Sequence, residues 1–183
     1  MSVISRNNFV YLAHPRTASM ATQRALKQMC GRRMKWERTQ PHHVGLKDCP
    51  NRTGNEFVFT TIRNPLDAIT SWYQLNPALH PKGFEWFVEN YKHNFLEQDG
   101  RMWYFIDQVD WVMRFETLQQ DFNTVCLKFQ RPRFRILPFN TTKGKRPYHD
   151  YHNHNTIKMM WQRFPKDMAL YYEYSTQYSG SLF

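Results

Sequence analysis

The run Glu56-Phe-Val-Phe-Thr-Thr-Ile62 constrains the fold more than any other part of this 183-residue chain. Its side chains are almost all aromatic or β-branched, which favours a β-strand. Because the apolar character is nearly continuous, we expect a central strand that is covered on both faces. Arg63-Asn64-Pro65 follows directly. Asn is a good helix cap and Pro is favoured at the first helical position, so we expect a helix from Pro65 to about Leu75.

The same order of strand, turn and helix recurs on both sides of this segment. Phe9–Ala13 is a β-type run that stops at His14-Pro15, and Met20–Cys30 has a helical pattern that ends at Gly31. Asp110–Phe115 and Leu118–Phe129 repeat the arrangement. The remaining expected elements are short strands around Lys35–Glu37 and Arg133–Leu137 and helices over Phe84–Leu96, Thr156–Phe164 and Pro165–Tyr174.

Strands that alternate with helices predict an α/β fold, with a central parallel sheet between two layers of helices. A chain of 183 residues fits one domain, which we expect to span residues 1–183. Its 14 Phe, 10 Tyr and 6 Trp residues can fill a dense core. In such sheets ligands bind beyond the carboxyl ends of the strands, so the segments that follow the strands are the places to look for a site.

The net charge of +10 and the isoelectric point near 9.7 point to an anionic partner, such as nucleic acid, an acidic glycan or a charged nucleotide. The cysteines Cys30, Cys49 and Cys126 are widely spaced, which argues against a disulfide framework or a structural zinc site. No signal pattern and no apolar stretch of bilayer length occur in the sequence. We therefore expect a cytoplasmic protein that does not enter a membrane.

The segment after the first strand, His14–Leu26, combines a helix start with donors for an anion. The first N–H groups of a helix lack partners and carry partial positive charge. Arg16 adds a guanidinium fork, and Thr17, Ser19 and Thr22 add hydroxyls. The chemistry resembles that of a P-loop, so we expect a P-loop-like sheet, although Gly-x-x-x-x-Gly-Lys-Ser/Thr is absent. The alternative is an ordinary turn whose helix is capped by Thr17 or Ser19.

The segment after the central strand carries a second anion-binding pattern. Arg63 lies at the end of the expected strand, and Ser71 lies two turns into the following helix. Arg63 could hold a phosphate with its fork while Ser71 donates a hydroxyl. In the alternative interpretation Asp67 pairs with Arg63 and Ser71 only packs.

Together these segments resemble the sulfotransferases that use 3′-phosphoadenosine 5′-phosphosulfate (PAPS), and among them the glycan-type members. Pro15-Arg-Thr-Ala-Ser-Met resembles the 5′-phosphosulfate loop of that family, and Arg63-Asn-Pro-Leu-Asp through Ser71-Trp-Tyr resembles its 3′-phosphate motif. Two later segments are also similar and come in the family's order: Met113-Arg-Phe-Glu-Thr-Leu118 and Leu137-Pro-Phe-Asn140 to Lys143 with Asp167–Tyr172. The resemblance implies transfer of a sulfuryl group to a hydroxyl without a metal, with adenosine 3′,5′-bisphosphate (PAP) as the product.

The resemblance also assigns site residues. Those implied to hold the 5′-phosphosulfate by side chain or backbone amide are Arg16, Thr17, Ala18, Ser19, Met20 and Ala21. Arg63 and Ser71 are implied to bind the 3′-phosphate, with Lys143 as a helper. Ala18 stands where the family usually has glycine, so we expect its backbone to avoid a strained φ. The aromatic residue that often stacks on adenine in this loop is missing, so the base has no assigned place.

His42-His43-Val44 lies between the two nucleotide motifs, where the glycan-type family has His-Gly-His-Val. Alignment on Val44 makes His43 the catalytic base that the resemblance implies, and His42 stays open as an alternative. Histidine suits this role because its neutral form is basic near pH 7. Without the resemblance, a histidine pair is more often a surface feature. Arg16, which is always charged, is implied to stabilise the leaving group.

The acceptor is open between a glycan, in particular an acidic one, and a small phenol or alcohol. Two other functions compete with sulfuryl transfer. A P-loop kinase or nucleotide hydrolase lacks support from a Gly-Lys-Ser/Thr motif. A basic nucleic-acid-binding module would leave the anion loop and the Arg63–Ser71 pair unexplained, so we expect no nucleic-acid partner. The histidines His149, His152 and His154 are interpreted as a polar loop rather than a zinc site.

Overall fold

The structure, a computed structural model, describes residues 3–5, 9–31, 36–38, 45–49, 54–91, 102–139, 141 and 146–177. Its centre is a five-stranded sheet with the order β3-β1-β2-β4-β5. The strands are β1 (Val3–Ser5), β2 (Phe9–Leu12), β3 (Trp36–Arg38), β4 (Phe57–Ile62) and β5 (Trp111–Arg114). β2, β4 and β5 run parallel to one another, whereas β1 runs antiparallel to both β2 and β3. The fold is therefore α/β with a small parallel core of three strands.

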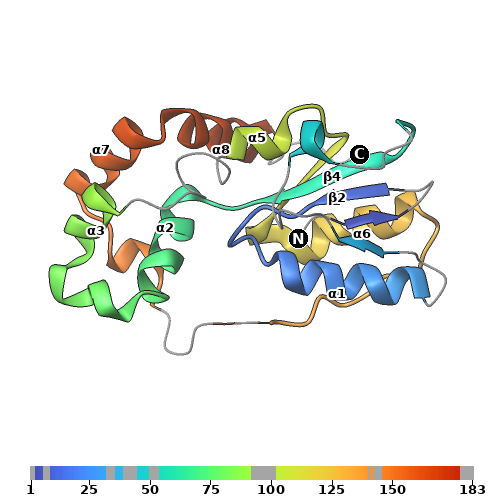
Figure 1. The fold of residues 1–183 in the computed structure, drawn as a ribbon, viewed down its shortest axis with the longest axis horizontal. Coiled ribbons are helices and arrows are strands. Elements are labelled where there is room, and N and C mark those ends of the chain that lie inside the picture. The colour runs from blue at the N-terminus through green and yellow to red at the C-terminus, as the bar shows by residue number, and fades with distance from the viewer. Residues whose placement is uncertain are drawn as a thin grey trace.

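Helices cover both faces of this sheet (Figure 1). The α-helices of the described part are α1 (Ser19–Cys30), α2 (Pro65–Gln74), α3 (Phe84–Asn90), α5 (Met102–Ile106), α6 (Leu118–Lys128), α7 (His154–Arg163) and α8 (Pro165–Gln177). Single 3₁₀ turns and one longer 3₁₀ segment lie between them: Leu46–Asp48, Pro77–Lys82, Phe115–Thr117 and Tyr148–Asp150. α1 and α6 pack on one face of the sheet, and α5 and α8 pack on the other.

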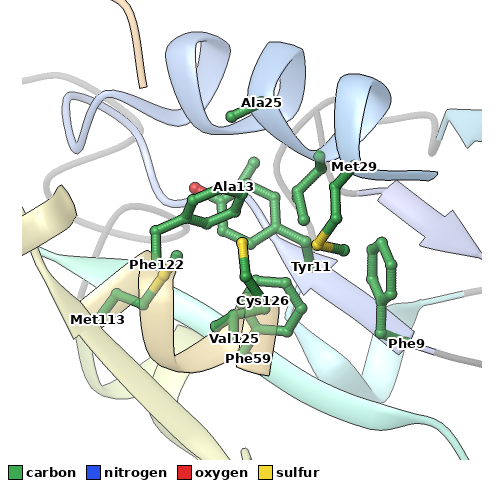
Figure 2. Packing of buried hydrophobic residues seen from close by; sticks show 11 residues of the cluster. Phe9, Tyr11, Ala13, Ala25, Met29, Phe59, Met113, Phe122, Val125 and Cys126 are labelled. Atoms are coloured by element: carbon green, nitrogen blue, oxygen red, sulfur yellow. The ribbon is translucent and has the colours of Figure 1, made fainter. Parts of the chain in front are cut away.

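The alternation of side chains along β2 explains how both layers are held. Phe9 and Tyr11 point to one face, where they meet Phe59 and the apolar sides of α1 and α6 (Figure 2). Val10 and Leu12 point to the other face and pack with residues of α5. β4 is buried from Val58 to Ile62, so the prediction of a central strand covered on both faces is confirmed.

The boundaries expected for most elements lie within a few residues of those observed, but the strand expected at Arg133–Leu137 is wrong. Residues 131–139 form no regular secondary structure. Instead, the side-chain amide of Gln119 on α6 pairs with this segment: its Nε2 donates to the carbonyl of Phe134 at 3.0 Å, and its Oε1 accepts the N–H of Ile136 at 2.8 Å. One amide side chain thus satisfies the backbone groups that a neighbouring strand would otherwise have paired.

Helix α3 ends at Asn90, within the helix expected to reach Leu96, and residues 92–101 lie outside the described part. β1 and α5 carry no prediction from the sequence. None of the helices in the described part of the chain has the length and apolar character that crossing a bilayer requires.

α5 also anchors the chain that follows the histidine pair. Gly45 packs against Tyr104 so closely that a Cβ there would lie 2.8 Å from the Tyr104 ring and 2.9 Å from its carbonyl oxygen. The Tyr104 hydroxyl donates to Asp48, and Lys47 pairs with Asp107 at 3.0 Å. These contacts hold residues 45–49 against the end of α5, on the face of the sheet opposite α1.

Candidate functional site

A cavity of about 730 Å³ opens at the carboxyl ends of the three parallel strands. One group of lining residues follows each strand: the loop and first turn of α1 after β2, Arg63 and Ser71 after β4, and Phe115–Gln120 after β5. Ile136, Pro138, Phe139 and Thr141 close the remaining side. The cavity therefore lies where parallel α/β sheets place their ligands.

The N-terminus of α1 faces this cavity without a side-chain cap. Its first three helical residues, Ser19, Met20 and Ala21, line the cavity, and the first N–H bonded within the helix is that of Thr22, to the Ala18 carbonyl at 3.0 Å. Neither Thr17 nor Ser19 caps the helix, so the alternative of an ordinary capped turn is wrong. By contrast, Asn64 caps α2 by accepting the N–H of Leu66 at 2.9 Å. The open end of α1 offers N–H groups to an anion.

The loop reaches this position through left-handed backbone. Ala18 has φ 59° and ψ 25°, and Arg16 has φ 62°. The expectation that Ala18 would avoid a strained φ is therefore wrong. Thr17 and Thr22 explain how the strain is tolerated: the Thr17 hydroxyl donates to the His14 carbonyl at 2.7 Å, and the Thr22 hydroxyl donates to the Ala18 carbonyl at 3.3 Å. The surrounding hydrogen bonds fix a turn that alanine alone disfavours.

Arg16 and Ser71 are in direct contact although they lie 55 positions apart. The guanidinium NH2 and Nε groups of Arg16 donate to Ser71 Oγ at 2.7 and 3.3 Å. The guanidinium also lies 5.6 Å from the centre of the Trp72 ring. Burial, together with the nearby positive charge of Arg63, lowers the pKa of Arg16. Ser71 does more than pack, because it orients one of the two cations of the site.

Arg63 is almost fully buried and connects several segments. Its Nε and NH2 groups meet Asp67 Oδ2 at 2.8 and 2.7 Å, which confirms the pairing considered as an alternative from the sequence. Its NH1 group donates to the Arg16 carbonyl at 2.8 Å, and its guanidinium lies 4.1 Å from the centre of the Phe115 ring. Arg16 and Arg63 thus line one cavity and are held together by a backbone hydrogen bond.

The acidic residue of the cavity, Glu116, is engaged in structural contacts. Its Oε1 accepts the N–H of Asn64 at 2.8 Å, and it hydrogen-bonds Tyr171 on α8. Burial and this negative charge raise the pKa of Tyr171. Glu116 therefore braces the start of α2.

Part of the cavity lining is apolar. It consists of Phe115, Leu118, Ile136, Pro138 and Phe139. The guanidinium of Arg24 on α1 lies 3.4 Å from the centre of the Phe139 ring, and this contact supports the ring from α1. The first turn of α6, which has no side-chain cap, also borders this part of the cavity. A ligand that carries both an anionic group and a flat apolar group matches this lining.

The structure brings together most residues that the sequence predicts for the site. Those lining the cavity are Arg16, Ala18, Ser19, Met20, Ala21, Arg63 and Ser71. Thr17 is fully buried beneath them and does not line the cavity; its hydroxyl stabilises the loop instead. His42, His43 and Lys143 lie outside the described residues.

No group of three or more metal-ligating side chains occurs among the residues that the structure describes. Of the three histidines interpreted as a polar loop, His152 is the most buried, and its Nε2 lies 3.0 Å from the Leu66 carbonyl and 3.3 Å from the Thr70 hydroxyl. Burial lowers the pKa of His152. This histidine packs against helix α2 as a structural residue.

Sequence reasoning missed Phe139 and the polar residues at the start of α6. A signal was present for Phe139, because Leu137-Pro-Phe-Asn140 is one of the four segments that resemble the family. No sequence signal pointed to Gln119 or Gln120, which reach the cavity only because α6 starts at its rim.

Comparison of the chain with family models, with curated proteins and with solved structures found no match. A functional assignment therefore depends on the chemistry of this cavity. Its main components are two guanidinium groups, an open helix N-terminus and an apolar wall.

Ala18→Gly should raise the free energy of unfolding by about 0.5–1 kcal/mol, because glycine adopts the left-handed conformation without the Cβ penalty but loses more entropy on folding. Urea unfolding followed by circular dichroism measures this change. Gln130→Gly is the matched control, because it makes the same kind of change at another left-handed residue (φ 51°) that does not line the cavity. An Ala18→Gly protein that is less stable than wild type would contradict the strain described for this turn.

Proposed function

We propose that this protein is a PAPS-dependent sulfotransferase that transfers a sulfuryl group to an acceptor hydroxyl. The observation that carries the proposal is the uncapped N-terminus of α1, which lines one cavity together with Arg16 and Arg63. The motifs that resemble this family in the sequence supply the residues of that cavity from two different strand ends. The strand, loop and helix from β2 into α1 have the order of a P-loop, so the proposal includes a P-loop-like phosphate site.

The residues of the cavity fit such a nucleotide. The volume of about 730 Å³ lies in the range of pockets that hold ligands of this size. Ser19, Met20 and Ala21 offer backbone N–H groups at the start of α1, and Arg16 adds a permanent positive charge. Phe139 and Ile136 provide an apolar surface for a base. When bound, PAPS supplies the sulfuryl group, and PAP departs as the other product.

The chemistry assigned to the protein side chains follows from charge. The acceptor oxygen forms a bond to sulfur as the bond from sulfur to the bridging phosphate oxygen breaks, and His43 accepts the proton of the acceptor hydroxyl. Negative charge grows on the bridging oxygen, where Arg16 and the N-terminus of α1 are suited to stabilise it. Lys143 is assigned to the phosphates from the segment that follows the cavity wall. The acceptor class stays open between a glycan and a small phenol or alcohol.

PAP should raise the thermal midpoint of the protein by several degrees without Mg²⁺, because binding to the folded state alone stabilises it. ATP and oligonucleotides at physiological salt should change the midpoint little. Arg16→Ala should remove most of the PAP shift, whereas Arg131→Ala, which removes an exposed arginine outside the cavity, should retain it. Thermal unfolding with each ligand measures these effects. A protein that responds to oligonucleotides and not to PAP would contradict the proposal.

Phe139→Ala should weaken PAP binding about tenfold, because stacking of a base on an aromatic ring contributes about 1–3 kcal/mol. Binding of inorganic pyrophosphate, which has no base, should change little in the same variant. Isothermal titration of both ligands separates the two effects. An equal loss for both ligands would show that Phe139 supports the loop and does not contact the base.

His43→Ala should lower turnover by about 10²–10⁴, the usual contribution of a general base, while PAP binding stays near wild type. An acceptor screen with labelled PAPS, covering phenols, simple alcohols and oligosaccharides, identifies the substrate for this measurement. His42→Ala is the matched control, because it removes the neighbouring imidazole. Wild-type turnover in His43→Ala would exclude this residue as the base.

A further inference from the structure

Arg63 and Ser71 both make hydrogen bonds within the protein, in contrast to residues whose polar groups are left for a ligand. Arg63 binds Asp67 with two nitrogens and the Arg16 carbonyl with the third. Ser71 Oγ accepts two N–H groups of the Arg16 guanidinium. Both residues therefore meet Arg16, one through its backbone and the other through its side chain.

Burial also distinguishes Arg63 and Ser71 from Arg16. Ser71 has 3% of its surface exposed and Arg63 has 5%, whereas Arg16 is only half-buried. An anion that enters the cavity therefore meets more of Arg16 than of the two residues behind it. The Ser71 oxygen is covered by the guanidinium that it binds at 2.7 Å.

The backbone of Arg16 also requires support. Its φ of 62° lies in the left-handed region, where a residue with a Cβ is strained by about 1–2 kcal/mol. The hydrogen bond from Arg63 NH1 fixes the carbonyl of this residue, and the hydrogen bonds to Ser71 fix the direction of its side chain. The ring of Trp72, next to Ser71 on α2, lies beneath the same guanidinium.

We infer that Arg63 and Ser71 are positioning residues, which act through Arg16, and that Arg16 and the N-terminus of α1 make the phosphate contacts. This inference rests on the proposed function and changes the role that Arg63 and Ser71 have in it. The resemblance assigns Arg63 and Ser71 to the 3′-phosphate of the nucleotide. A positioning role instead makes their contribution independent of the 3′-phosphate and dependent on Arg16.

Two ligands and a double-mutant cycle test this inference. PAP carries phosphates at the 3′ and 5′ positions, whereas adenosine 5′-monophosphate carries only the 5′-phosphate. Affinities for both are measured by isothermal titration with wild type, Ser71→Ala, Arg16→Ala and the double variant. We expect Ser71→Ala to weaken both nucleotides by the same factor, about tenfold, because a charge-assisted hydrogen bond that orients Arg16 is lost. In the Arg16→Ala background, Ser71→Ala should change neither affinity.

A loss confined to PAP, which persists after removal of Arg16, would overturn the inference and leave the proposed function standing. It would show that the Ser71 hydroxyl contacts the 3′-phosphate directly. A wild-type protein that binds neither nucleotide would overturn the proposed function, and the inference with it. The two failures are therefore distinguishable.

A second variant covers the case in which Ser71→Ala disturbs folding, because Ser71 is buried in α2. Arg63→Lys keeps a positive charge at the end of β4, but a single ammonium group cannot span Asp67 and the Arg16 carbonyl as the guanidinium does. Positioning predicts that Arg63→Lys weakens both nucleotides equally. A selective loss of PAP affinity would instead place Arg63 on the 3′-phosphate.

Discussion

The buried guanidinium of Arg63 is the interaction on which the arrangement of the cavity depends. It lies at the end of the central strand and contacts the loop after β2 through the Arg16 carbonyl, helix α2 through Asp67, and the turn after β5 through the Phe115 ring. Parallel strands bring their carboxyl ends to one edge, but they do not fix the loops that follow. A planar group with five donors can hold three such loops at once, and the paired carboxylate compensates its buried charge.

The open end of α1 has a structural cause and a chemical result. The turn before it places alanine, which has no polar side chain, at the capping position, and the nearby hydroxyls of Thr17 and Thr22 bind carbonyl groups of the loop. The hydroxyls therefore stabilise a strained turn and leave the helix N–H groups uncovered. A serine or asparagine that capped the helix would stabilise it but would fill the place of an anion. The local instability is consistent with a site that a ligand completes.

Much of the fold could be predicted because β4 and β2 are apolar on both faces and each strand is followed by a helix start such as Asn64-Pro65. The location of the candidate site was predicted from the same alternation of strands and helices, because ligands bind beyond the carboxyl ends of parallel strands. The prediction of a strand at Arg133–Leu137 was wrong because the backbone of this segment hydrogen-bonds the side chain of Gln119. A tertiary contact of this kind leaves no periodic pattern in the sequence. The contact between Arg16 and Ser71 was also beyond reach, since it arises from the way distant segments meet. The left-handed φ of Ala18 was not predicted because alanine gives no signal for this conformation, which local hydrogen bonds stabilise.

The pairing between Gln119 and residues 134–136 has a consequence for how the cavity wall is held. The wall formed by Ile136, Pro138 and Phe139 is hydrogen-bonded to α6 by a single side chain, not by a ladder of backbone bonds. Phe134 and Ile136 also pack against the core, and Phe139 contacts Arg24. Breaking the two hydrogen bonds alone requires about 1–3 kcal/mol, and separating Phe134 and Ile136 from the core adds to that cost. Because residues 131–139 contribute no strand to the sheet, this wall can separate from α6 while the ladder between the parallel strands stays intact.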